Sequence, residues 1–367
     1  MQRERHSDPV YLGYAEEYEE SRLYQLRSCF FPLGKVGGQP SWLNPVKLPS
    51  TADVTCKVCS APMCFLLQVY ATAEKDAIHS FHRSLFFFIC RNAKCNKVND
   101  ASNMAVFRCC LPRTNDFYPD SNPPDPSLLS EEECPPSHPD AAPLCSVCGC
   151  LATKRCAKCT RAWYCSRDHQ VIDWKGGHSS SCGSTQHQTT ANTFTFPEMG
   201  MDLEREDLPA SILEDSDEDD DEEADEVEQK RLAEYANVVK AQKLDKGNAE
   251  GEEIDEPEEK DKFFERFNRV VSLYPEQILR YQRGGTPLIA TDKGGLEMES
   301  LVSRCPLCSG GRHFEMQLMP HLVSLIGVDQ VGDSIDWASV YVFTCSANCA
   351  IPDYGYSPEE LVKQDFT

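Results

Sequence analysis

Apolar residues along the chain form a few compact runs separated by long polar stretches. Residues 64–73 and 85–90 combine aliphatic and aromatic side chains, and residues 339–344 read Ser-Val-Tyr-Val-Phe-Thr. β-Branched and aromatic residues in runs of this length are typical of buried strands. We therefore expect strands at these positions.

After residue 262 the apolar positions follow a helical period instead. Five hydrophobic residues fall at i, i+1, i+4, i+7 and i+8, namely Phe263, Phe264, Phe267, Val270 and Val271. This spacing places them on one stripe of a helix that docks on a core. We expect a second helix after Pro320 and a polar tail at the end.

Composition divides the chain into five segments. Prolines are dense in the second segment, and acidic residues dominate positions 214–228 of the fourth, so neither is expected to pack as a core. The segments are 8–118, a folded β-rich unit; 119–143, a proline-rich linker; 145–182, a cysteine-dense module; 183–261, an acidic, largely disordered linker; and 262–367, a second folded unit.

The chain contains 20 cysteines. It starts with charged residues and no apolar signal segment follows them, so we expect the cysteines to be reduced. Reduced cysteines that recur as C-x-x-C pairs are metal ligands more often than redox centres. Zinc is therefore the expected cofactor.

The net charge of −23 restricts the possible partners. With a pI near 4.8 the chain repels phosphate backbones, so we expect no direct binding of nucleic acid. The apolar runs are too short to cross a bilayer core of about 30 Å, so we expect no membrane span. Basic proteins are the favoured partners.

Two parts of the chain repeat one order of features. In the first part this order is Cys56-x2-Cys59, an apolar run, an aromatic run and Cys90-x4-Cys95. In the second part it recurs as Cys305-x2-Cys308, an apolar run, an aromatic run and Cys345-x3-Cys349. One tetrahedral zinc in each part would hold two strand ends side by side. We infer an α+β fold with two zinc-stapled β-rich units that form a bipartite body, one zinc in each.

The module at 145–182 carries eight further candidate ligands. They are Cys145, Cys148, Cys156, Cys159, Cys165, His169, His178 and Cys182. Eight ligands complete two tetrahedral sites, and so short a segment needs metal to supply its folding energy. The spacing resembles the MYND zinc finger, although His169 stands where most such fingers have cysteine. Imidazole is an equally competent zinc ligand.

The MYND resemblance implies interleaved pairs. One zinc would take Cys145, Cys148, Cys165 and His169, and the other would take Cys156, Cys159, His178 and Cys182. Trp163 and Tyr164 lie beside these ligands. They either form a docking surface for proline-containing peptides or pack over the zinc.

The other cysteines and the histidines do not have ligand spacing. Cys150 has no place in the finger pattern and is expected to be a bystander, and buried thiol clusters remain the alternative for the two four-cysteine sets. We expect core or surface thiols at Cys29, Cys64, Cys109, Cys110 and Cys134. Packed or exposed side chains are expected at His79, His82, His313 and His321.

No catalytic residue is expected. Cysteine-rich sites that fill all four zinc positions are structural, whereas catalytic zinc keeps one position open. Gly37-Gly38 precedes Gln-Pro and not the Lys-Ser or Lys-Thr of a phosphate-binding loop, so it indicates a turn.

Outside the finger, the sequence resembles the programmed cell death protein 2 family over nearly its whole length. The resemblance rests on residues 12–16, 35–43, 65–71, 111–118, 275–281, 314–320 and 334–337. It implies a dedicated chaperone for 40S subunit biogenesis in cytoplasm and nucleus. Its client would be a small-subunit ribosomal protein of the universal S-five class, the eukaryotic S-two protein, captured during synthesis.

Several alternatives remain open. The acidic run at 214–228 either screens a basic client or is a solvated spacer, and Ser216 within it is a candidate for acid-directed phosphorylation. Trp42 is either a core residue or an exposed client contact. An alternative function is that of an adaptor, in which the MYND finger binds partners in transcription or cell survival.

Overall fold

The computed structural model describes residues 9–28, 34–72, 77–118, 129–133, 138–184, 193–209, 261–293, 298–328 and 334–366. The acidic run 214–228 with Ser216, and also Cys29 and Cys134, lie outside the described residues. Their predictions therefore stay predictions.

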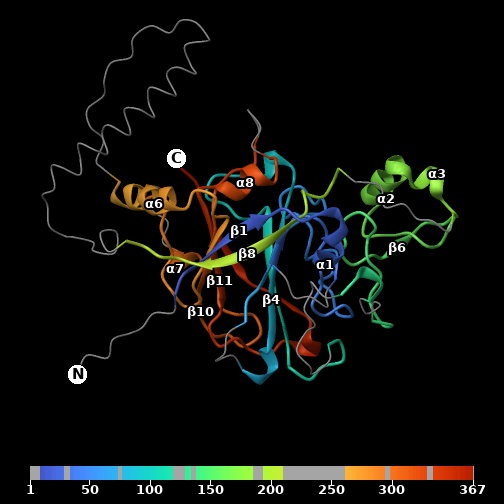
Figure 1. Cartoon of the computed structure of the whole chain (residues 1–367), viewed down its shortest axis with the longest axis horizontal. Coiled ribbons are helices and arrows are strands. Elements are labelled where there is room, and N and C mark those ends of the chain that lie inside the picture. Colours follow the sequence, from blue (N-terminus) through green and yellow to red (C-terminus); the bar gives the residue numbers. More distant parts are fainter. Residues whose placement is uncertain are drawn as a thin grey trace, which may run out of the picture.

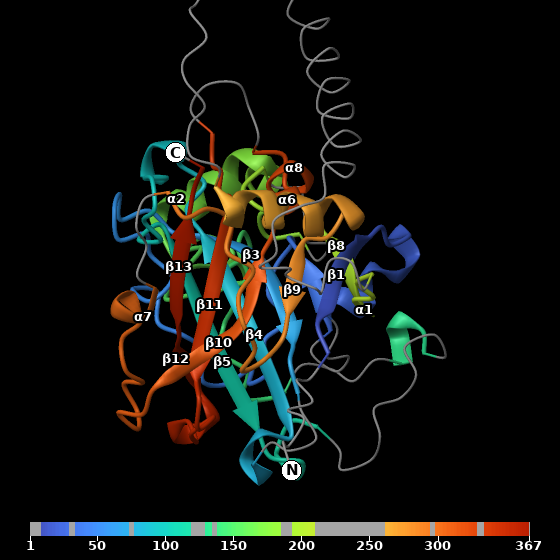
Figure 2. The same cartoon turned by 90° about the vertical axis from the view of Figure 1, so that its left-hand side faces the viewer.

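Within the described residues, eleven strands form one antiparallel sheet (Figures 1 and 2). In order across the sheet they are β12 (Tyr356–Pro358), β5 (Met104–Leu111), β4 (His82–Ile89), β3 (Cys64–Tyr70), β2 (Gly34–Val36), β8 (Met199–Arg205), β1 (Tyr11–Glu16), β9 (Leu279–Tyr281), β10 (Arg312–Leu318), β11 (Ser339–Cys345) and β13 (Glu360–Gln364). The strands predicted at 64–73, 85–90 and 339–344 are confirmed as β3, β4 and β11.

The sheet curls into a nearly closed barrel. Strands β12 and β13 lie at its opposite ends, yet only Glu359 separates them in the chain. The backbone N–H of Glu359 donates to the carbonyl oxygen of Val106 in β5 at 3.0 Å. One residue therefore carries the chain from one edge of the sheet to the other.

The helices are short. They are α1 (Leu23–Arg27), α2 (Arg167–Asp173), α3 (Ser179–Ser181), α6 (Lys262–Leu273), α7 (Met298–Leu301) and α8 (His321–Leu325), with single turns at η1 (Glu20–Arg22), η2 (Ile78–Ser80), η3 (Ala93–Cys95), η5 (Glu131–Glu133), η6 (Trp174–His178) and η7 (Pro352–Tyr354). Helices α2 and α3 lie in the finger at the right of Figure 1, and the other α helices lie around the barrel. Among the described residues, no helix has the length and apolar character that a bilayer crossing requires.

Both predicted helices are confirmed. In α6 the carboxylate of Asp261 accepts a hydrogen bond from the N–H of Phe264 at 2.9 Å and so caps the first turn. Phe267 and Val270 face the protein, whereas Phe263 and Phe264 are exposed. Helix α8 follows Pro320 as expected.

Both faces of the sheet are packed at β4. Along β4, Leu85, Phe87 and Ile89 point into the barrel, where they join apolar residues of β9, β10 and β11. The alternate residues Phe86 and Phe88 point outward into a second cluster. Because successive side chains of a strand point to opposite faces, burial on both sides requires a nearly continuous apolar run.

The two halves of the barrel repeat one arrangement. Strands β2, β3, β4 and β5 follow each other across the sheet, and β9, β10, β11 and β13 do the same. Both copies contain a register shift, between Phe65 and Leu67 in β3 and between Phe314 and Met316 in β10. The repeated order of cysteines thus corresponds to a repeated strand order, although the two copies share one sheet.

Two segments differ from the expectation. Strand β8 lies inside the predicted linker 183–261 and pairs with both β1 and β2, so the prediction of a largely disordered linker was wrong for this strand. Its residues from Asp202 onward are exposed and all but Leu203 are polar, which hid the strand in the composition. The expected polar tail contains β12 and β13, whose buried Lys363 and Gln364 form hydrogen bonds.

The Gly37-Gly38 turn brings β2 close to the segment before β8. Gly37 has a φ of 65°, and a Cβ atom there would lie 1.9 Å from the carbonyl oxygen of Pro197. Both the positive φ and the missing side chain are therefore needed at this position.

Substituting Gly37→Ala should lower the free energy of unfolding by about 3 kcal/mol or more, because an unfavourable φ and a backbone clash act together. Gly327→Ala is the control, because Gly327 has a φ of 67° and, apart from its chain neighbours, no atom of the described residues lies within 4 Å of its added Cβ. That variant should lose only about 1–2 kcal/mol in urea unfolding. Equal losses in both variants would refute the close-contact explanation.

Candidate metal centres

The structure brings the sixteen predicted ligands together in four groups. Within each group the ligand atoms lie within 4.8 Å of one another. The groups are Cys56, Cys59, Cys90 and Cys95; Cys145, Cys148, Cys165 and His169; Cys156, Cys159, His178 and Cys182; and Cys305, Cys308, Cys345 and Cys349. The two finger groups have the membership that the MYND resemblance implied.

Each group contains a Cys-x-x-Cys turn with the same backbone geometry. The residue after the second cysteine has a positive φ in all four turns: 61° at Ser60, 69° at Gly149, 55° at Thr160 and 58° at Ser309. Its N–H donates to the carbonyl oxygen of the first cysteine at 2.9 Å in every case. Positive φ is uncommon for serine and threonine, so these turns are held by their surroundings. They place both sulfurs on one side, as two zinc ligands require.

The sulfur separations fit zinc. Pairs of Sγ atoms are 3.6 Å apart for Cys59–Cys90, Cys305–Cys349 and Cys308–Cys345, 3.7 Å for Cys148–Cys165 and 3.9 Å for Cys156–Cys182. A tetrahedron with Zn–S bonds of about 2.3 Å has edges of about 3.8 Å. Disulfide sulfurs lie about 2.05 Å apart, and the described cysteines are all free thiols. Each group can therefore hold one zinc ion.

The finger histidines present different nitrogens to the two groups. Nδ1 of His169 lies 3.1 Å from Sγ of Cys165, whereas Nε2 of His178 lies 3.6 Å from Sγ of Cys159. The carboxylate of Asp173 lies 3.9 Å from Nδ1 of His178 and accepts a hydrogen bond from the Tyr164 hydroxyl at 2.6 Å. At 3.9 Å the carboxylate is an electrostatic neighbour of the imidazole and not a hydrogen-bond acceptor.

The two aromatic residues beside the finger ligands, Trp163 and Tyr164, differ in burial and in their contacts. Tyr164, in the two-stranded sheet of β6 (Lys154–Arg155) and β7 (Trp163–Tyr164), is fully buried and packs over the metal group. Trp163 is half-buried, and the guanidinium of Arg155 lies over its ring. A docking surface that includes Tyr164 is therefore excluded.

The cysteines without ligand spacing stay outside the four groups. Cys64, Cys109, Cys110 and Cys150 are buried thiols, and the Sγ of Cys150 faces the carbonyl oxygen of Cys148 at 3.8 Å. In the described part of the chain, His79, His82, His313 and His321 also belong to no group. His79 and His82 bond to the Asn348 carbonyl and the Tyr70 hydroxyl at 2.7 and 2.9 Å.

The finger is docked on the first half of the barrel. The indole of Trp42 is buried, stacks on Phe86 and Phe88, and donates from Nε1 to the carbonyl oxygen of Gly149 at 2.7 Å. The side-chain amide of Gln39 donates to the carbonyl oxygens of Ser146 and Val147 at 3.2 Å. Of the two roles considered for Trp42, an exposed client contact was wrong, and the residue joins the body to the finger.

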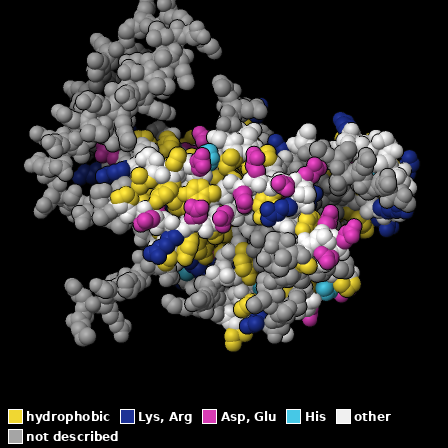
Figure 3. Space-filling view, in the orientation of Figure 1, with side chains coloured by type: hydrophobic (Ala, Val, Ile, Leu, Met, Phe, Trp, Pro, Cys, Tyr) yellow, Lys and Arg dark blue, Asp and Glu magenta, His cyan; other side chains and the backbone are white. Residues whose placement is uncertain are grey.

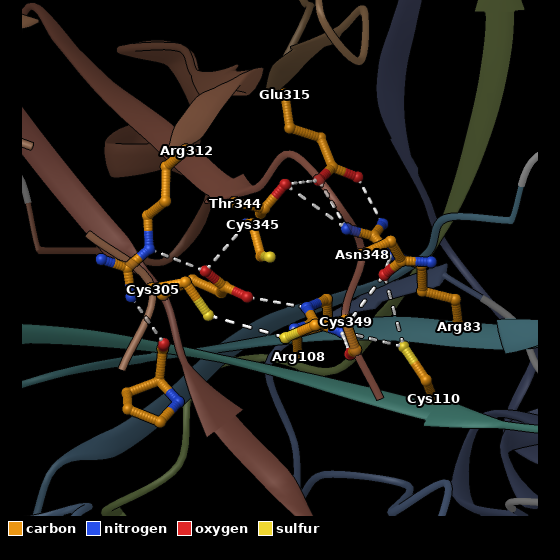
Figure 4. A network of polar contacts seen from close by, with 12 residues as sticks. Arg83, Arg108, Cys110, Cys305, Arg312, Glu315, Thr344, Cys345, Asn348 and Cys349 are labelled. Carbon is orange, nitrogen blue, oxygen red and sulfur yellow. Dashed lines mark hydrogen bonds and ion pairs between the residues drawn. The ribbon is translucent and has the colours of Figure 1, made fainter. Parts of the chain in front are cut away.

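A buried ion network joins the two halves inside the barrel (Figure 4). Arg83 of β4 donates to both carboxylate oxygens of Glu315 in β10, at 2.5 and 2.7 Å. Arg108 of β5 donates through Nε to Glu359 at 2.7 Å, and Arg312 donates to the other oxygen of Glu359 at 2.9 Å. The side chains of Arg83, Arg108, Glu315 and Glu359 are fully buried.

The register shift in β10 positions Glu315. It falls between Phe314 and Met316, so the outward Phe314 is followed by a carboxylate among inward residues. Burial alone would raise the pKa of Glu315, but the Arg83 charge and hydrogen bonds from Arg83 and Thr344 lower it to about 2. The pair is therefore ionised at neutral pH, and removing either partner leaves a buried charge.

Each half of the barrel has a loop that carries two candidate ligands of its own metal group, Cys90 and Cys95 in the first half and Cys345 and Cys349 in the second. Both of these body metal loops contact the opposite half. Arg108 of the first half donates to the carbonyl oxygen of Cys349 and to Oδ1 of Asn348, both at 3.1 Å. Lys363 of β13 donates to the carbonyl oxygen of Lys97, just after the first metal group, at 3.1 Å. Each half thus supplies a buried cation to the metal loop of the other. Sequence spacing predicted the candidate ligands of the four groups but not these contacts.

The zinc assignment predicts different metal contents for two neighbouring substitutions. The unsubstituted protein should contain about four zinc ions per chain, one for each four-ligand group. Cys148→Ala should lose at least one zinc, whereas Cys150→Ala, two residues away and also buried, should retain all of them. Elemental analysis and native mass spectrometry measure the number of zinc ions per chain in each variant. Two or fewer ions in the unsubstituted protein would refute zinc in the body groups.

The ion network predicts a large stability effect at one position. Glu315→Gln should lower the free energy of unfolding by about 3–5 kcal/mol, because Arg83 stays buried without its counter-charge. The control is Asp353→Asn in the exposed pair with Lys47, which should cost at most about 1 kcal/mol.

Urea unfolding measures the free energy of unfolding of each variant. A zinc assay on the same variant shows whether a loss of stability comes from the broken ion pair or from lost metal. The double variant Arg83→Met, Glu315→Met should recover part of the stability, because it removes both charges. If Glu315→Gln lowered the free energy of unfolding as little as the control does, the proposed importance of the Arg83–Glu315 pair would be contradicted.

Family comparisons agree with this architecture. Residues 9–125 match the N-terminal domain of programmed cell death protein 2, residues 261–365 match its C-terminal putative domain, and residues 145–182 match the MYND finger. No solved structure matches the chain.

Curated relatives match over most of their length. Programmed cell death protein 2 of Mus musculus is 38% identical over 98% of this chain and 97% of its own, and that of Bos taurus is 37% identical over the same shares. The probable 20S rRNA accumulation protein 4 of Schizosaccharomyces pombe is 27% identical over 86% of this chain and 88% of its own. With both family domains, the finger and near-complete coverage, the chain belongs to the programmed cell death protein 2 family.

Proposed function

We propose that this protein is a dedicated chaperone for a small-subunit ribosomal protein of the universal S-five class, acting in 40S subunit biogenesis in cytoplasm and nucleus. The observation that carries the proposal is family membership together with a relative whose name refers to 20S rRNA accumulation, which points to ribosome biogenesis. The client would be captured during its synthesis.

The charge of the molecule supports a basic client. Its net charge is −23. Acidic side chains lie across the outward face of β1 and β8, where Glu16, Asp202 and Glu204 are exposed (Figure 3). Ribosomal proteins carry basic extensions, and complementary charge speeds their capture and screens them from stray RNA.

The acidic run at 214–228 would add to this screening charge. Phosphorylation of Ser216 would increase it further. A chaperone with these features needs no catalytic group. Each metal group offers four protein ligands, which fills a tetrahedral zinc and leaves no open position for a reaction.

A second candidate function is an adaptor that acts through the finger and binds proline-containing peptides. It is favoured by two exposed apolar residues of the finger, Val171 and Trp174, each 40% exposed. Because removing the finger would uncover Trp42, deletion of residues 145–182 is a poor test. Trp174→Ala should leave client binding unchanged if the barrel is the chaperone body, and should abolish it if the finger is the binding site.

The acidic face predicts a salt-dependent rate of association. The double variant Asp202→Asn, Glu204→Gln should bind the purified client more slowly at low salt, because two carboxylates that attract it are lost. At high salt the rate should approach that of the unsubstituted protein. Stopped-flow fluorescence measures both rates.

The control neutralises two exposed carboxylates elsewhere, Glu131→Gln and Glu132→Gln in η5. It changes the net charge equally, so any larger effect of the first variant reflects its position. Failure of the unsubstituted protein to bind the client at all would refute the chaperone proposal. Equal rates for both double variants would refute only the role of the β1–β8 face.

A further inference from the structure

The outward faces of the two halves carry equivalent aromatic clusters. In the first half, Phe65 pairs with Phe88 and Phe86 pairs with Phe107. In the second half the same register places Phe314 opposite Phe343 and Tyr341 opposite Val362. The two sets occupy matching positions relative to the register shifts described above.

The loops over these faces also match. Gly37 and Gly284 begin Gly-Gly-x-Pro turns with φ values of 65° and 72°. Four residues later, the N–H of Ser41 donates to the side chain of Gln68 at 2.9 Å, and the N–H of Leu288 donates to Gln317 at 2.8 Å. The next residue is Trp42 in the first half and Ile289 in the second. Ile289 is therefore the structural equivalent of Trp42.

The outward faces of the two halves are covered by different parts of the chain. The first face is covered by the docked finger, through Trp42 and Gly149. On the second face Ile289, Met298 and Val302 pack against the aromatic cluster, so that Phe314 and Phe343 are only 6% and 9% exposed. Beside them lies an open cleft of about 1090 Å³ whose apolar lining is Phe263, Pro287, Ile289, Met298, Phe314 and Phe343. At its mouth, Phe263 of α6 is 46% exposed. Hydrophobic side chains gather around α6 in Figure 3.

The charged and polar residues that line the cleft would allow a basic segment to bind there. Arg312 directs its charge at the carboxylates of Glu359 and Glu360, at 2.9 and 3.5 Å. Burial lowers the pKa of His313, so its imidazole is neutral at pH 7. Asp292 is an exposed carboxylate in the lining. The cleft lining is thus about half apolar, and Asp292 adds an exposed carboxylate beside the exposed Lys293.

The second face also lacks the donors that hold the finger on the first. The indole N–H of Trp42 and the amide of Gln39 are replaced at the equivalent positions by Ile289 and Thr286. A zinc knuckle that presents backbone carbonyls would find no indole there. Apolar side chains suit this face better than a second finger.

We propose that this cleft is a docking site for an apolar segment, flanked by basic residues, of the ribosomal protein client. The proposal rests on the chaperone function proposed above and names the surface that carries it out. On the first half the same face holds a module of the chain itself, and on the second half it holds the client.

The test uses the full-length, zinc-loaded protein and the purified client. A photoreactive phenylalanine analogue at Phe263 should crosslink to the client on illumination. The matched control places the analogue at Phe81, which is 47% exposed on the first half. That position should give no crosslink.

The same positions supply an affinity test. Phe263→Ser should weaken client binding about tenfold, as loss of an aromatic contact with the client does, whereas Phe81→Ser should change it less than about twofold. Unchanged zinc content and urea midpoints show that both variants are folded.

The outcomes separate the two proposals. Normal client binding with no crosslink at position 263 and an unchanged affinity for Phe263→Ser would overturn the cleft and leave the chaperone function standing. Absence of client binding by the unsubstituted protein would overturn both. A crosslink between two copies of this chain in place of the client would overturn the proposed occupant.

Discussion

The ion pairs between Arg83 and Glu315 and between Arg108 and Glu359 constrain the whole barrel. Each joins a cation of the first half to a carboxylate of the second, in a space from which water is excluded. A half that folded alone would bury an arginine without its counter-charge, or would have to leave that part of its interior open to water. The two halves are therefore interdependent, even though the sequence reads as two separate cysteine-bearing units. The body metal loops lie at this boundary, so the zinc sites and the ion network stabilise the same junction.

Local features could be predicted from the sequence, and long-range ones could not. Cys-x-x-Cys spacing and short aromatic runs depend on neighbouring residues, and they located the metal groups and strands β3, β4 and β11. The partners in the ion network are 232 and 251 residues apart, and nothing near Arg83 or Arg108 in the sequence marks them as buried. Strand β8 was missed for a related reason. Its exposed half is polar, and backbone pairing with β1 and β2 holds it in the sheet.

The finger is the part of the molecule whose role changes most once the fold is known. Its spacing indicates a self-contained zinc module inserted between two halves. In the fold it also shields the aromatic face of the first half, and Trp42 contributes both to that face and to the contact with Gly149. Loss of the finger would therefore expose apolar surface on the barrel, so effects of its removal do not identify a binding role by themselves.

The direct connection of β12 to β13 through Glu359 affects the order in which the strands of the sheet can pair during synthesis. Strands β12 and β13 follow the other nine strands of the described sheet in sequence, and they cover the edges of β5 and β11. On a translating ribosome those two edges stay unpaired until β12 and β13 have emerged. Unpaired edges invite pairing with other chains. A protein proposed to protect newly made chains is thus itself vulnerable until its own strands β12 and β13 have been made.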